Sequence, residues 1–459
     1  MASPLDVVIL AAGQGKRMHS ALPKALHRLA GRPLAAHVLA AVRALSPRAI
    51  AVVTGYGAEA VERALAAPDL NFVRQDPPRG TGDAARVALD VLPSDGVTLV
   101  GLGDVPLVAS EALASVAEIA QGNRVGLLTA RVRNPLGLGR VIRGADGNVQ
   151  AIVEERDATP DERAINEVNT GFIAAPSVLL KRWLARLTPH NAQEELYLTD
   201  IVAMAVADGV PVGAHVASDE VSVLGINDRA QLASLERIVQ RRRAMTLMLA
   251  GTTIVDPHRI DIRGELECGR DVTIDVGCIF EGAVRIEDGA SVGPYCVLRD
   301  VTVGPDTRIE AYSHVDATSI GRNCRIGPFA RLRPGTNLAE DVHIGNFVEV
   351  KASTIGAGSK ANHLAYVGDA VIGSRVNYGA GSITANYDGA NKHQSFIGDD
   401  VHVGSNCVLV APITIGAGAT IGGGSTIVKE APPAQLTLAR PAQVSIARWQ
   451  RPRKKQRVE

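Results

Sequence analysis

Apolar and polar positions alternate in blocks along the first half of the chain. Four short runs of almost continuous apolar character stand out, at 7–10, 50–53, 97–100 and 125–128. Such runs are typical of strands that are buried on both faces of a sheet. Amphipathic stretches between them, of which 33–45 and 58–65 are the clearest, predict helices. The alternation predicts a Rossmann-like α/β domain with a largely parallel sheet, whose ligands bind at the carboxyl ends of the strands.

The second half places an apolar residue at about every sixth position from residue 252 onward. Twenty positions keep this phase: Ile274, Phe280, Ile286, Val292, Leu298, Val303, Ile309, Val315, Ile320, Ile326, Leu332, Leu338, Ile344, Val350, Ile397, Val403, Leu409, Ile415, Ile421 and Ile427. A period of six is typical of a parallel β-helix, in which one side chain of each hexad points inward and small residues turn the corners. Strands of a β-sandwich would instead alternate with a period of two.

These patterns divide the chain into four parts. The α/β domain covers 1–227, and apolar residues at roughly helical spacing predict a connecting helix within 228–250. The hexad domain covers 251–440, and 441–459 form a basic tail.

Two segments of the second half break the hexad phase. Residues 384–396 are polar, which predicts a loop that leaves the prism. Residues 448–457 are basic and interrupted by proline, and for them a solvated tail is favoured over a nucleic-acid or membrane patch.

Composition narrows the class of protein. Of 459 residues, 48 are Lys or Arg and 48 are Asp or Glu, and this balance argues against a protein that coats nucleic acid or an anionic membrane. A hydrophobic share of 46% excludes wholesale disorder. Aromatic residues are only 3% and glycines number 46, which fits a narrow prism with little room for rings.

The cysteines and the lengths of the apolar stretches indicate the cellular compartment of the protein. The five cysteines all lie in the second half and form no CxxC pair, so buried thiols in a reducing cytosol fit better than a disulfide framework or a zinc knuckle. The first ten residues lack the features of a signal peptide, and no apolar run approaches the length of a membrane span. We expect a cytoplasmic protein.

A glycine-containing loop follows the first predicted strand directly. Gly13 and Gly15 would let backbone N–H groups approach a phosphate, and Lys24 could neutralise phosphate charge. The loop lacks the third glycine of the dinucleotide motif, and Arg17 stands where a P-loop has Ser or Thr. By itself, Lys24 is better explained as a surface lysine.

Further candidates follow other strands of this domain. Gln75 and the Gly80-Thr81 turn could read the edge of a base. Asp104 and Asn227 are oxygen ligands suited to Mg²⁺ beside phosphates. The alternatives remain open, since Asp104 could cap a turn before a proline and Asn227 could cap the connecting helix.

The hexad domain carries basic and aromatic residues in one cluster. If about 18 residues make one turn of the prism, Arg333 and Lys351 stack on one edge, as a phosphate site requires. His363 can act as a general base near neutral pH, and Tyr366 lies in the adjacent coil. A structural role for a single histidine is the alternative. His343, His363 and His402 could also indicate a zinc site like that of γ-carbonic anhydrases, but no coordination pattern supports one.

At these residues the chain resembles known families. Residues 5–228 resemble sugar-1-phosphate nucleotidyltransferases, and the hexad domain resembles left-handed β-helix acyltransferases. Together they resemble the bacterial bifunctional N-acetylglucosamine-1-phosphate uridylyltransferase/glucosamine-1-phosphate N-acetyltransferase family. The resemblance implies acetylation of glucosamine 1-phosphate by acetyl-CoA. It then implies Mg²⁺-dependent uridylyl transfer from UTP to N-acetylglucosamine 1-phosphate, with release of pyrophosphate. It also implies a homotrimer with cofactor grooves between subunits, and neither a nucleic-acid nor a membrane partner.

The resemblance assigns roles to individual residues. Catalytic roles fall to His363, Arg17 and Lys24, and Mg²⁺ binding to Asp104 and Asn227. Nucleotide and sugar binding at the uridylyl site is implied for Leu10, Ala11, Ala12, Gly13, Lys24, Gln75, Gly80, Thr81, Leu102, Gly103, Asp104, Gly139, Glu154, Asn169 and Asn227. Glucosamine 1-phosphate binding is implied for Arg333, Lys351, Tyr366 and Asn377. Acetyl-CoA binding is implied for Ala380, Asn386, Tyr387, Ser405, Gly423 and Arg440.

A few positions depart from the family pattern. Lys16 replaces a usual Thr, Leu102 a common Tyr, and Gly423 a more frequent Ala, while 191–197 lacks the usual Gly and first Tyr. These changes bear on substrate affinity rather than on the reaction.

Two other functions are weighed against the bifunctional enzyme. One is a nucleotidyltransferase whose β-helix only trimerises or regulates, and the other is an oligomeric structural protein. The cluster around His363 favours the bifunctional enzyme.

Overall fold

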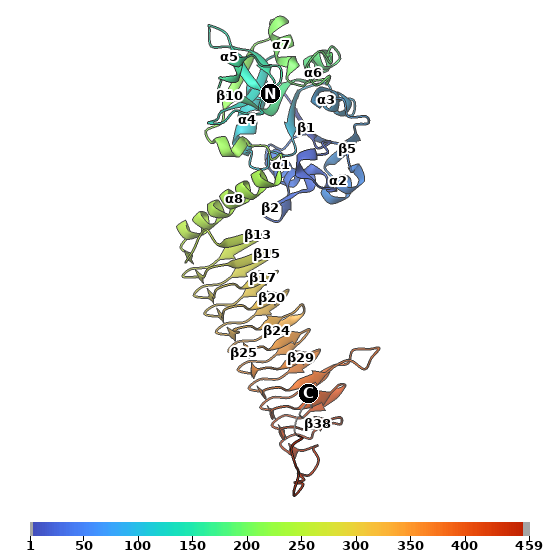
Figure 1. Cartoon of the computed structure of the whole chain (residues 1–459), viewed down its shortest axis with the longest axis vertical. Coiled ribbons are helices and arrows are strands. Elements are labelled where there is room, and N and C mark those ends of the chain that lie inside the picture. The colour runs from blue at the N-terminus through green and yellow to red at the C-terminus, as the bar shows by residue number, and fades with distance from the viewer. Residues whose placement is uncertain (1–2, 453–459) are drawn as a thin grey trace, which may run out of the picture. The chain divides into compact units, whose positions relative to one another are not determined.

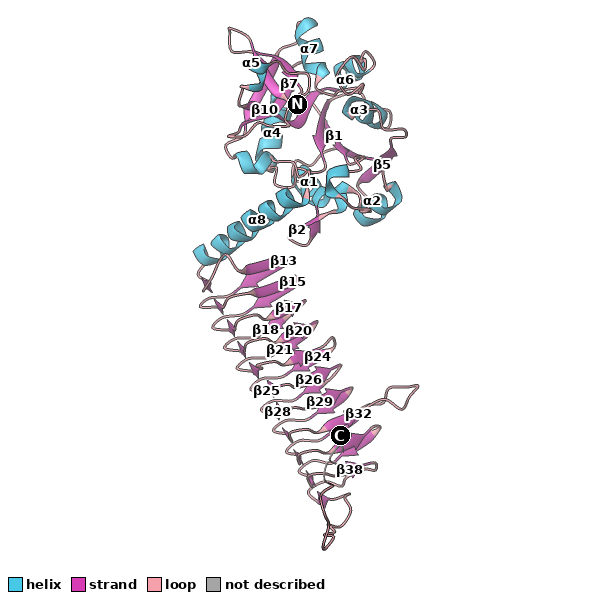
Figure 2. Ribbon diagram, in the orientation of Figure 1, coloured by secondary structure: helices cyan, strands magenta, loops and turns pink. Residues whose placement is uncertain are grey.

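The computed structural model describes residues 3–452, and the chain divides into two compact units between residues 239 and 240. The first unit combines helices and strands, whereas the second consists of short strands and turns after the end of helix α8 (Arg229–Leu249) (Figure 1, Figure 2). The predicted helix between the two halves is present as α8.

The first unit is built on a nine-stranded sheet with the central order β11-β7-β10-β6-β1-β4-β5. Its strands are β1 (Leu5–Leu10), β4 (Ala49–Thr54), β5 (Leu70–Arg74), β6 (Val97–Leu102), β7 (Val125–Arg131), β8 (Arg140–Arg143), β9 (Val149–Val153), β10 (Glu167–Pro176) and β11 (Val212–Val216). The four predicted strands are therefore present as β1, β4, β6 and β7. Strands β1, β4, β5 and β6 are parallel neighbours, whereas β10 runs antiparallel to β6 and β7.

Helices and short turns complete the first unit. The helices are α1 (Leu34–Arg43), α2 (Ala58–Leu65), α3 (Thr81–Leu89), α4 (Ser110–Ile119), α5 (Pro160–Arg163), α6 (Ser177–Leu184) and α7 (Asp200–Ala207). The 3-10 turns are η1 (Lys16–Met18), η2 (Lys24–Leu26) and η3 (Glu220–Val223), and a short hairpin joins β2 (Arg28–Leu29) to β3 (Arg32–Pro33). In β1, Val7 and Ile9 belong to one buried cluster and Val8 to another. Both faces of the sheet are covered, which explains the continuous apolar runs.

The second unit is a parallel β-helix, visible as a stack of coils (Figure 1). Its strands form an 11-stranded sheet from β12 (Thr253–Ile254) to β39 (Leu436–Thr437) and a 17-stranded sheet from β13 (Ile260–Cys268) to β38 (Thr426–Ile427). Val350 pairs with Leu332, eighteen residues earlier, and with Val367, seventeen residues later. All twenty hexad positions are at most 5% exposed, so the predicted inward phase is confirmed.

Several aromatic rings of the β-helix lie outside the prism rather than within it. Tyr295, Tyr312, Phe329 and Phe347 follow one another along one corner, with successive ring centroids 5.3, 5.0 and 5.3 Å apart. Each of these residues has a positive φ and a side chain that is about half exposed. We call this stack the aromatic corner. Phe280 and Tyr378, by contrast, are buried in the core.

The predicted loop is shorter than its sequence suggests. Strand β32 (Ile383–Ala385) continues through Thr384, and β33 begins at Ser395 (Ser395–Ile397), so 386–394 form the loop that projects from the coils (Figure 1). Thr384 belongs to the core because its hydroxyl accepts from Gly368 N at 2.8 Å and donates to Gly368 O at 3.0 Å. The expected boundaries of 384 and 396 are corrected accordingly.

The end of the chain and its helices complete the description. Residues 441–452 are exposed and contain neither helix nor strand, and the rest of the predicted basic tail lies outside the described residues. Within 3–452, none of the helices is both long enough and apolar enough to cross a bilayer.

Candidate active sites

A cavity of about 890 Å³ opens beyond the carboxyl ends of β1 and β6 in the first unit. Eleven of the predicted residues line it: Leu10, Ala11, Ala12, Gly13, Lys24, Gln75, Gly80, Thr81, Leu102, Gly103 and Asp104. These residues come from three separate chain segments, which follow the strands β1, β5 and β6, and the parallel arrangement of these strands brings the segments to one edge of the sheet. This is the position at which an open α/β sheet binds its ligands.

Three positions around this cavity are glycine for different physical reasons. Gly15 adopts a φ of 66°, and a Cβ there would lie 2.8 Å from the Cβ of Lys24, so glycine lets that lysine approach. Gly80 has a φ of 111°, and its Cβ would lie 2.6 Å from the carbonyl oxygen of Leu196. Gly13 has open space beside it, which keeps the loop accessible to a ligand. The two glycines of the Gly-x-Gly motif therefore leave room both for the Lys24 side chain and for a ligand.

Gln75 is buried, and its amide is anchored in the cavity wall. Its Nε2 donates to the carbonyl oxygen of Gly80 at 3.0 Å and to Asp83 at 2.9 Å. Burial opposes ionisation of Asp83, but the hydrogen bonds from Gln75 and Arg86 outweigh it and keep the pKa of Asp83 below its ordinary value. With both amide protons engaged, Gln75 can contact a ligand only through its carbonyl oxygen, as an acceptor.

Lys24 lies between the two predicted metal ligands. Its ammonium forms an ion pair with the Asp104 carboxylate and donates to Asn227 Oδ1 at 2.9 Å. Two oxygen atoms from distant parts of the chain therefore converge on one position that already holds a positive charge. Carboxylate and amide oxygens are the donors that Mg²⁺ prefers, so the donor set fits this metal.

A second cavity of about 380 Å³ shares Thr81, Leu102 and Asp104 with the first. The remaining predicted residues of this domain line it: Arg17, Gly139, Glu154, Asn169 and Asn227. The structure therefore brings every predicted residue of the first unit to one of two adjoining cavities.

Glu154 is the partly buried acid of the second cavity. Burial raises its pKa, and the charges of Asp200 and Asp157 add to the rise, against a hydrogen bond from Thr199 Oγ1 of 3.1 Å. A Cβ on Gly139 would lie 3.3 Å from both carboxylate oxygens, so glycine keeps the acid open to the cavity.

Leu102 and the 191–197 segment, which both depart from the family pattern, are accommodated locally. A Cβ on Gly171 would lie 2.3 Å from Leu102 Cδ1, so the leucine packs directly over that glycine. Leu196 is held on both sides, since its N donates to Arg79 O and its O accepts from Gly82 N, each at 2.8 Å. Glu195 lines the first cavity, which the sequence did not indicate.

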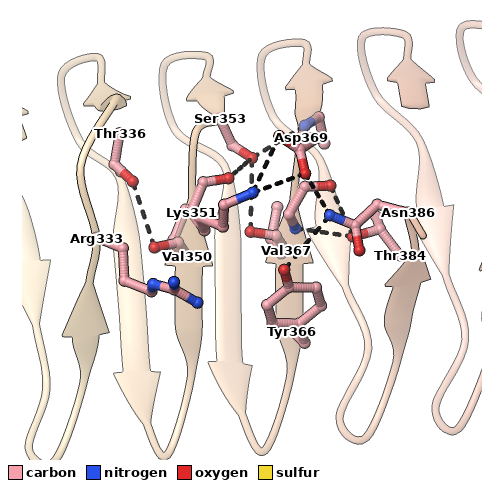
Figure 3. Close-up of polar contacts among 12 residues, drawn as sticks. Arg333, Thr336, Val350, Lys351, Ser353, Tyr366, Val367, Asp369, Thr384 and Asn386 are labelled. Carbon is pink, nitrogen blue, oxygen red and sulfur yellow. Dashed lines mark hydrogen bonds and ion pairs between the residues drawn. The ribbon is translucent and has the colours of Figure 1, made fainter. Parts of the chain in front are cut away.

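In the β-helix, the predicted phosphate-binding residues share one face. Arg333, Lys351 and Tyr366 lie side by side in successive coils (Figure 3), and Lys351 and Tyr366 belong to β26 (Glu349–Lys351) and β29 (Tyr366–Gly368). Arg333 donates to Glu349 at 2.8 Å. Lys351 Nζ is 3.0 Å from a carboxylate oxygen of Asp369.

His363 and Asn377 lie on the other sheet, in β28 (Lys360–His363) and β31 (Asn377–Tyr378). The predicted cluster is therefore distributed over two faces. His363 Nδ1 is 2.8 Å from Asn346 Oδ1, and since an amide oxygen only accepts, Nδ1 carries the proton. Nε2 of the neutral ring then has the lone pair that a general base needs. Asn377 contacts His402 at 3.2 Å, and no group of three metal-ligating side chains occurs within 3–452.

The predicted acetyl-CoA residues lie near the projecting loop and in the coils after it. Asn406 N donates to Ala380 O, and Gly424 N donates to Ser405 O, each at 2.8 Å, which stacks Ala380, Ser405 and Gly423 in three successive coils. Arg440 Nη1 donates to Gly423 O at 2.9 Å. Asn386 and the exposed Tyr387 belong to the loop itself.

Sequence reasoning missed two partners of these residues, Asn346 and Asp369. Asn346 precedes His363 by one coil, and Asp369 follows Lys351 by eighteen residues. Coil spacing was the signal that would have found both of them.

Comparisons with known proteins agree with this division. Residues 7–169 match the MobA-like NTP transferase domain family, 262–355 match the GMPPB C-terminal domain, and 395–429 match the bacterial transferase hexapeptide repeat. Fold and sites thus define a transferase in which a nucleotidyltransferase domain precedes a hexapeptide-repeat domain. The solved nucleotidyl transferase from Methanothermobacter thermautotroptrophicus is 24% identical and covers 52% of this chain and 99% of its own, with a TM-score of 0.39.

Curated relatives match over almost the whole chain. The bifunctional protein GlmU of Acidovorax ebreus is 54% identical over 98% of both chains. The proteins of the same name from Methylibium petroleiphilum and Azoarcus sp. are each 55% identical over 98% of this chain and over 100% and 99% of their own. The chain belongs to the family of bifunctional GlmU proteins.

Proposed function

We propose that the chain carries out both steps from glucosamine 1-phosphate to UDP-N-acetylglucosamine. The β-helix acetylates glucosamine 1-phosphate with acetyl-CoA, and the α/β unit then transfers uridylyl from UTP to the product. The observation that carries the proposal is the similarity of the chain, over 98% of its length, to bifunctional GlmU proteins. The grouping of the predicted residues at the cavities of the first unit and on the coils of the β-helix supports it.

Uridylyl transfer requires positioning and charge stabilisation. A phosphate oxygen of N-acetylglucosamine 1-phosphate attacks the α-phosphorus of UTP, and pyrophosphate leaves. Arg17 and Lys24 line the two adjoining cavities and would stabilise the charge on the phosphorus and the leaving group. Asp104 and Asn227 would hold Mg²⁺, which when bound neutralises phosphate charge. Glu154 and Asn169 would orient the sugar in the smaller cavity.

Acetyl transfer requires a base and an anion site. Arg333 and Lys351 would bind the phosphate of glucosamine 1-phosphate. His363 Nε2 takes a proton from the ammonium of the sugar, and the nitrogen forms a bond to the thioester carbonyl carbon. As the carbon–sulfur bond breaks, the nitrogen loses a second proton, which protonates the departing sulfur, so that an amide forms and CoA leaves as the thiol. Asn346 fixes the tautomer of His363 in which Nε2 is the base.

We further propose a homotrimer, located in the cytoplasm. The exposed rings of the aromatic corner support an interface between copies, since stacked rings that are half in water gain free energy when covered. Leu364 continues this corner beside His363 and is 63% exposed. The five free cysteines support a reducing compartment.

One incubation tests both activities. The protein is mixed with glucosamine 1-phosphate, acetyl-CoA, UTP and Mg²⁺, and the products are followed by mass spectrometry, with each component omitted in turn. N-acetylglucosamine 1-phosphate should appear without UTP, and UDP-N-acetylglucosamine only with all four components. Uridylyl transfer without any acetylation would reduce the β-helix to a scaffold.

A further inference from the structure

Asp369 lies at a corner of the β-helix between β29 and β30 (Ala370–Ile372), where its φ is 50°. Its backbone is fixed on both sides, since its N donates to Lys351 O and its O accepts from Ser395 N, each at 3.0 Å. Its carboxylate accepts from Lys351 Nζ and from Asn386 Nδ2 (Figure 3). One acid therefore contacts residues from the preceding coil and from both ends of the projecting loop.

The two side chains that Asp369 holds belong to different halves of the proposed acetyl-transfer site. Lys351 is assigned to the sugar phosphate and Asn386 to acetyl-CoA. Asn386 is 8% exposed and also lies 3.4 Å from the Tyr366 hydroxyl. The projecting loop starts at Asn386 and ends before Ser395, so Asp369 closes the loop against the face that carries Lys351.

The Asp369 carboxylate cannot be explained by a role in attracting the phosphate of the sugar. A carboxylate beside Lys351 offsets part of the positive charge that would bind the anion. Burial disfavours the charged form of Lys351, yet Asp369 outweighs burial and holds the pKa of Lys351 above its ordinary value. The nearby charge of Lys351 lowers the pKa of Lys392 in the loop. Asp369 favours the charged form of Lys351 and fixes the direction of its side chain.

We propose that Asp369 is a positioning residue that couples the two substrate halves of the acetyl-transfer site, holding Lys351 for the sugar phosphate and Asn386 for the acyl donor with one carboxylate. This inference rests on the proposed acetyltransferase function. Loss of Asp369 impairs binding of both substrates at once, whereas loss of either partner side chain impairs binding of one.

The corner tolerates the test substitution. Ala317 and Ala352 occupy the same corner two coils apart, with φ values of 42° and 44°, so Asp369→Ala keeps an accepted backbone conformation. Asp300 stands at this corner in an earlier coil with a φ of 51° and accepts from Ala283 N at 3.0 Å. Asp300→Ala is therefore a matched control that removes the same group from the same kind of corner.

Steady-state release of CoA, measured with a thiol reagent, gives kcat and both KM values for each variant. Asp369→Ala should raise the KM values for glucosamine 1-phosphate and for acetyl-CoA by about tenfold each, as loss of charge-assisted hydrogen bonds predicts. Asn386→Ala should raise only the KM for acetyl-CoA, and Asp300→Ala neither. Uridylyl transfer by each variant checks folding. A change in only one KM, or in none, for Asp369→Ala overturns the proposal.

A pH series with Asp369→Asn separates positioning from a purely structural role. The titratable and charged groups around Lys351 are Asp369 and Tyr366 from the next coil, Arg333 from the preceding one, and Lys392 from the loop. Without the acid, less opposes the effect of burial, so the pKa of Lys351 falls and the side chain loses its proton at lower pH. The KM for glucosamine 1-phosphate should therefore begin to rise at a lower pH than in the wild type, and an unchanged profile overturns the proposal. If the wild type forms no acetylated product, the acetyltransferase function itself fails.

Discussion

The Lys24 ammonium is paired with the Asp104 carboxylate, at the position where that carboxylate and Asn227 would together hold a metal ion. The lysine therefore lies at the point where the two oxygens converge. A metal ion bound there must displace the ammonium, and phosphate oxygens of a nucleotide are the acceptors that would receive it. Binding of a metal ion would thus be linked to the position of the Lys24 side chain and to nucleotide binding.

Lys24→Met tests this linkage. Because the competing charge is removed, Mn²⁺ affinity of the nucleotide-free protein should rise about tenfold, measured by the electron paramagnetic resonance signal of free Mn²⁺. Uridylyl transfer should fall about 100-fold or more, since charge stabilisation at the phosphates is lost. Lys16→Met, which changes another lysine of the same cavity, serves as the control for Mn²⁺ affinity. Unchanged or weaker Mn²⁺ binding in Lys24→Met would contradict the linkage.

The environment of Glu154 predicts how the stability of the folded protein depends on pH. Burial, followed by the charges of Asp200 and Asp157, raises its pKa in the folded protein. A raised folded pKa favours folding below the pKa of the unfolded chain, and this contribution is lost as pH rises through the folded value. Glu154→Gln should therefore raise the melting temperature relative to the wild type at pH 7 to 8. At about pH 4 the difference should vanish. An equal gain at both pH values would point to packing instead.

Asn346 and His363 make a prediction about the acetyl-transfer base. His363→Ala should lower acetyl transfer by about 10²- to 10⁴-fold, the range for loss of a general base. Asn346→Ala leaves the ring but removes the acceptor that fixes its tautomer, so a smaller loss of about tenfold is expected. CoA release reports both effects, while uridylyl transfer should remain at the wild-type rate. Full acetyl-transfer activity of His363→Ala would remove it from the mechanism.

The aromatic corner makes a prediction about assembly. Phe347→Glu places a charge on a ring stack that is 56% exposed at this residue, so the fold of the single chain should be little affected. If the corner lies between copies, the charge would be buried in the interface, and the oligomer should dissociate in sedimentation velocity experiments. Val428→Glu, at a position that is 63% exposed elsewhere on the β-helix, should leave the assembly intact. Oligomers of equal size in both variants would place the interface elsewhere.

The sequence predicted those features that a local period or a strand end specifies. Ile344 is buried because its hexad phase demands it, and Gly13 and Asp104 line the same cavity because both follow parallel strands. The antiparallel direction of β10 was not predictable, since an apolar run does not encode the polarity of its strand. Asp369 was not predicted because its partners are neighbours across coils, and coil length varies from seventeen or eighteen residues to twenty-five where the projecting loop is inserted.

The projecting loop shows how the β-helix gains chemistry. Asn377 pairs with Lys360, seventeen residues earlier, but with His402, twenty-five residues later. The extra residues all leave at one corner, and beyond them Val403 is again fully buried. The strand register and the buried core of the β-helix are thus unaffected by the residues inserted between two strands. The corner of such a coil therefore accepts inserted loops, so evolution or engineering can exchange the loop that recognises a ligand without redesigning the rest of the β-helix.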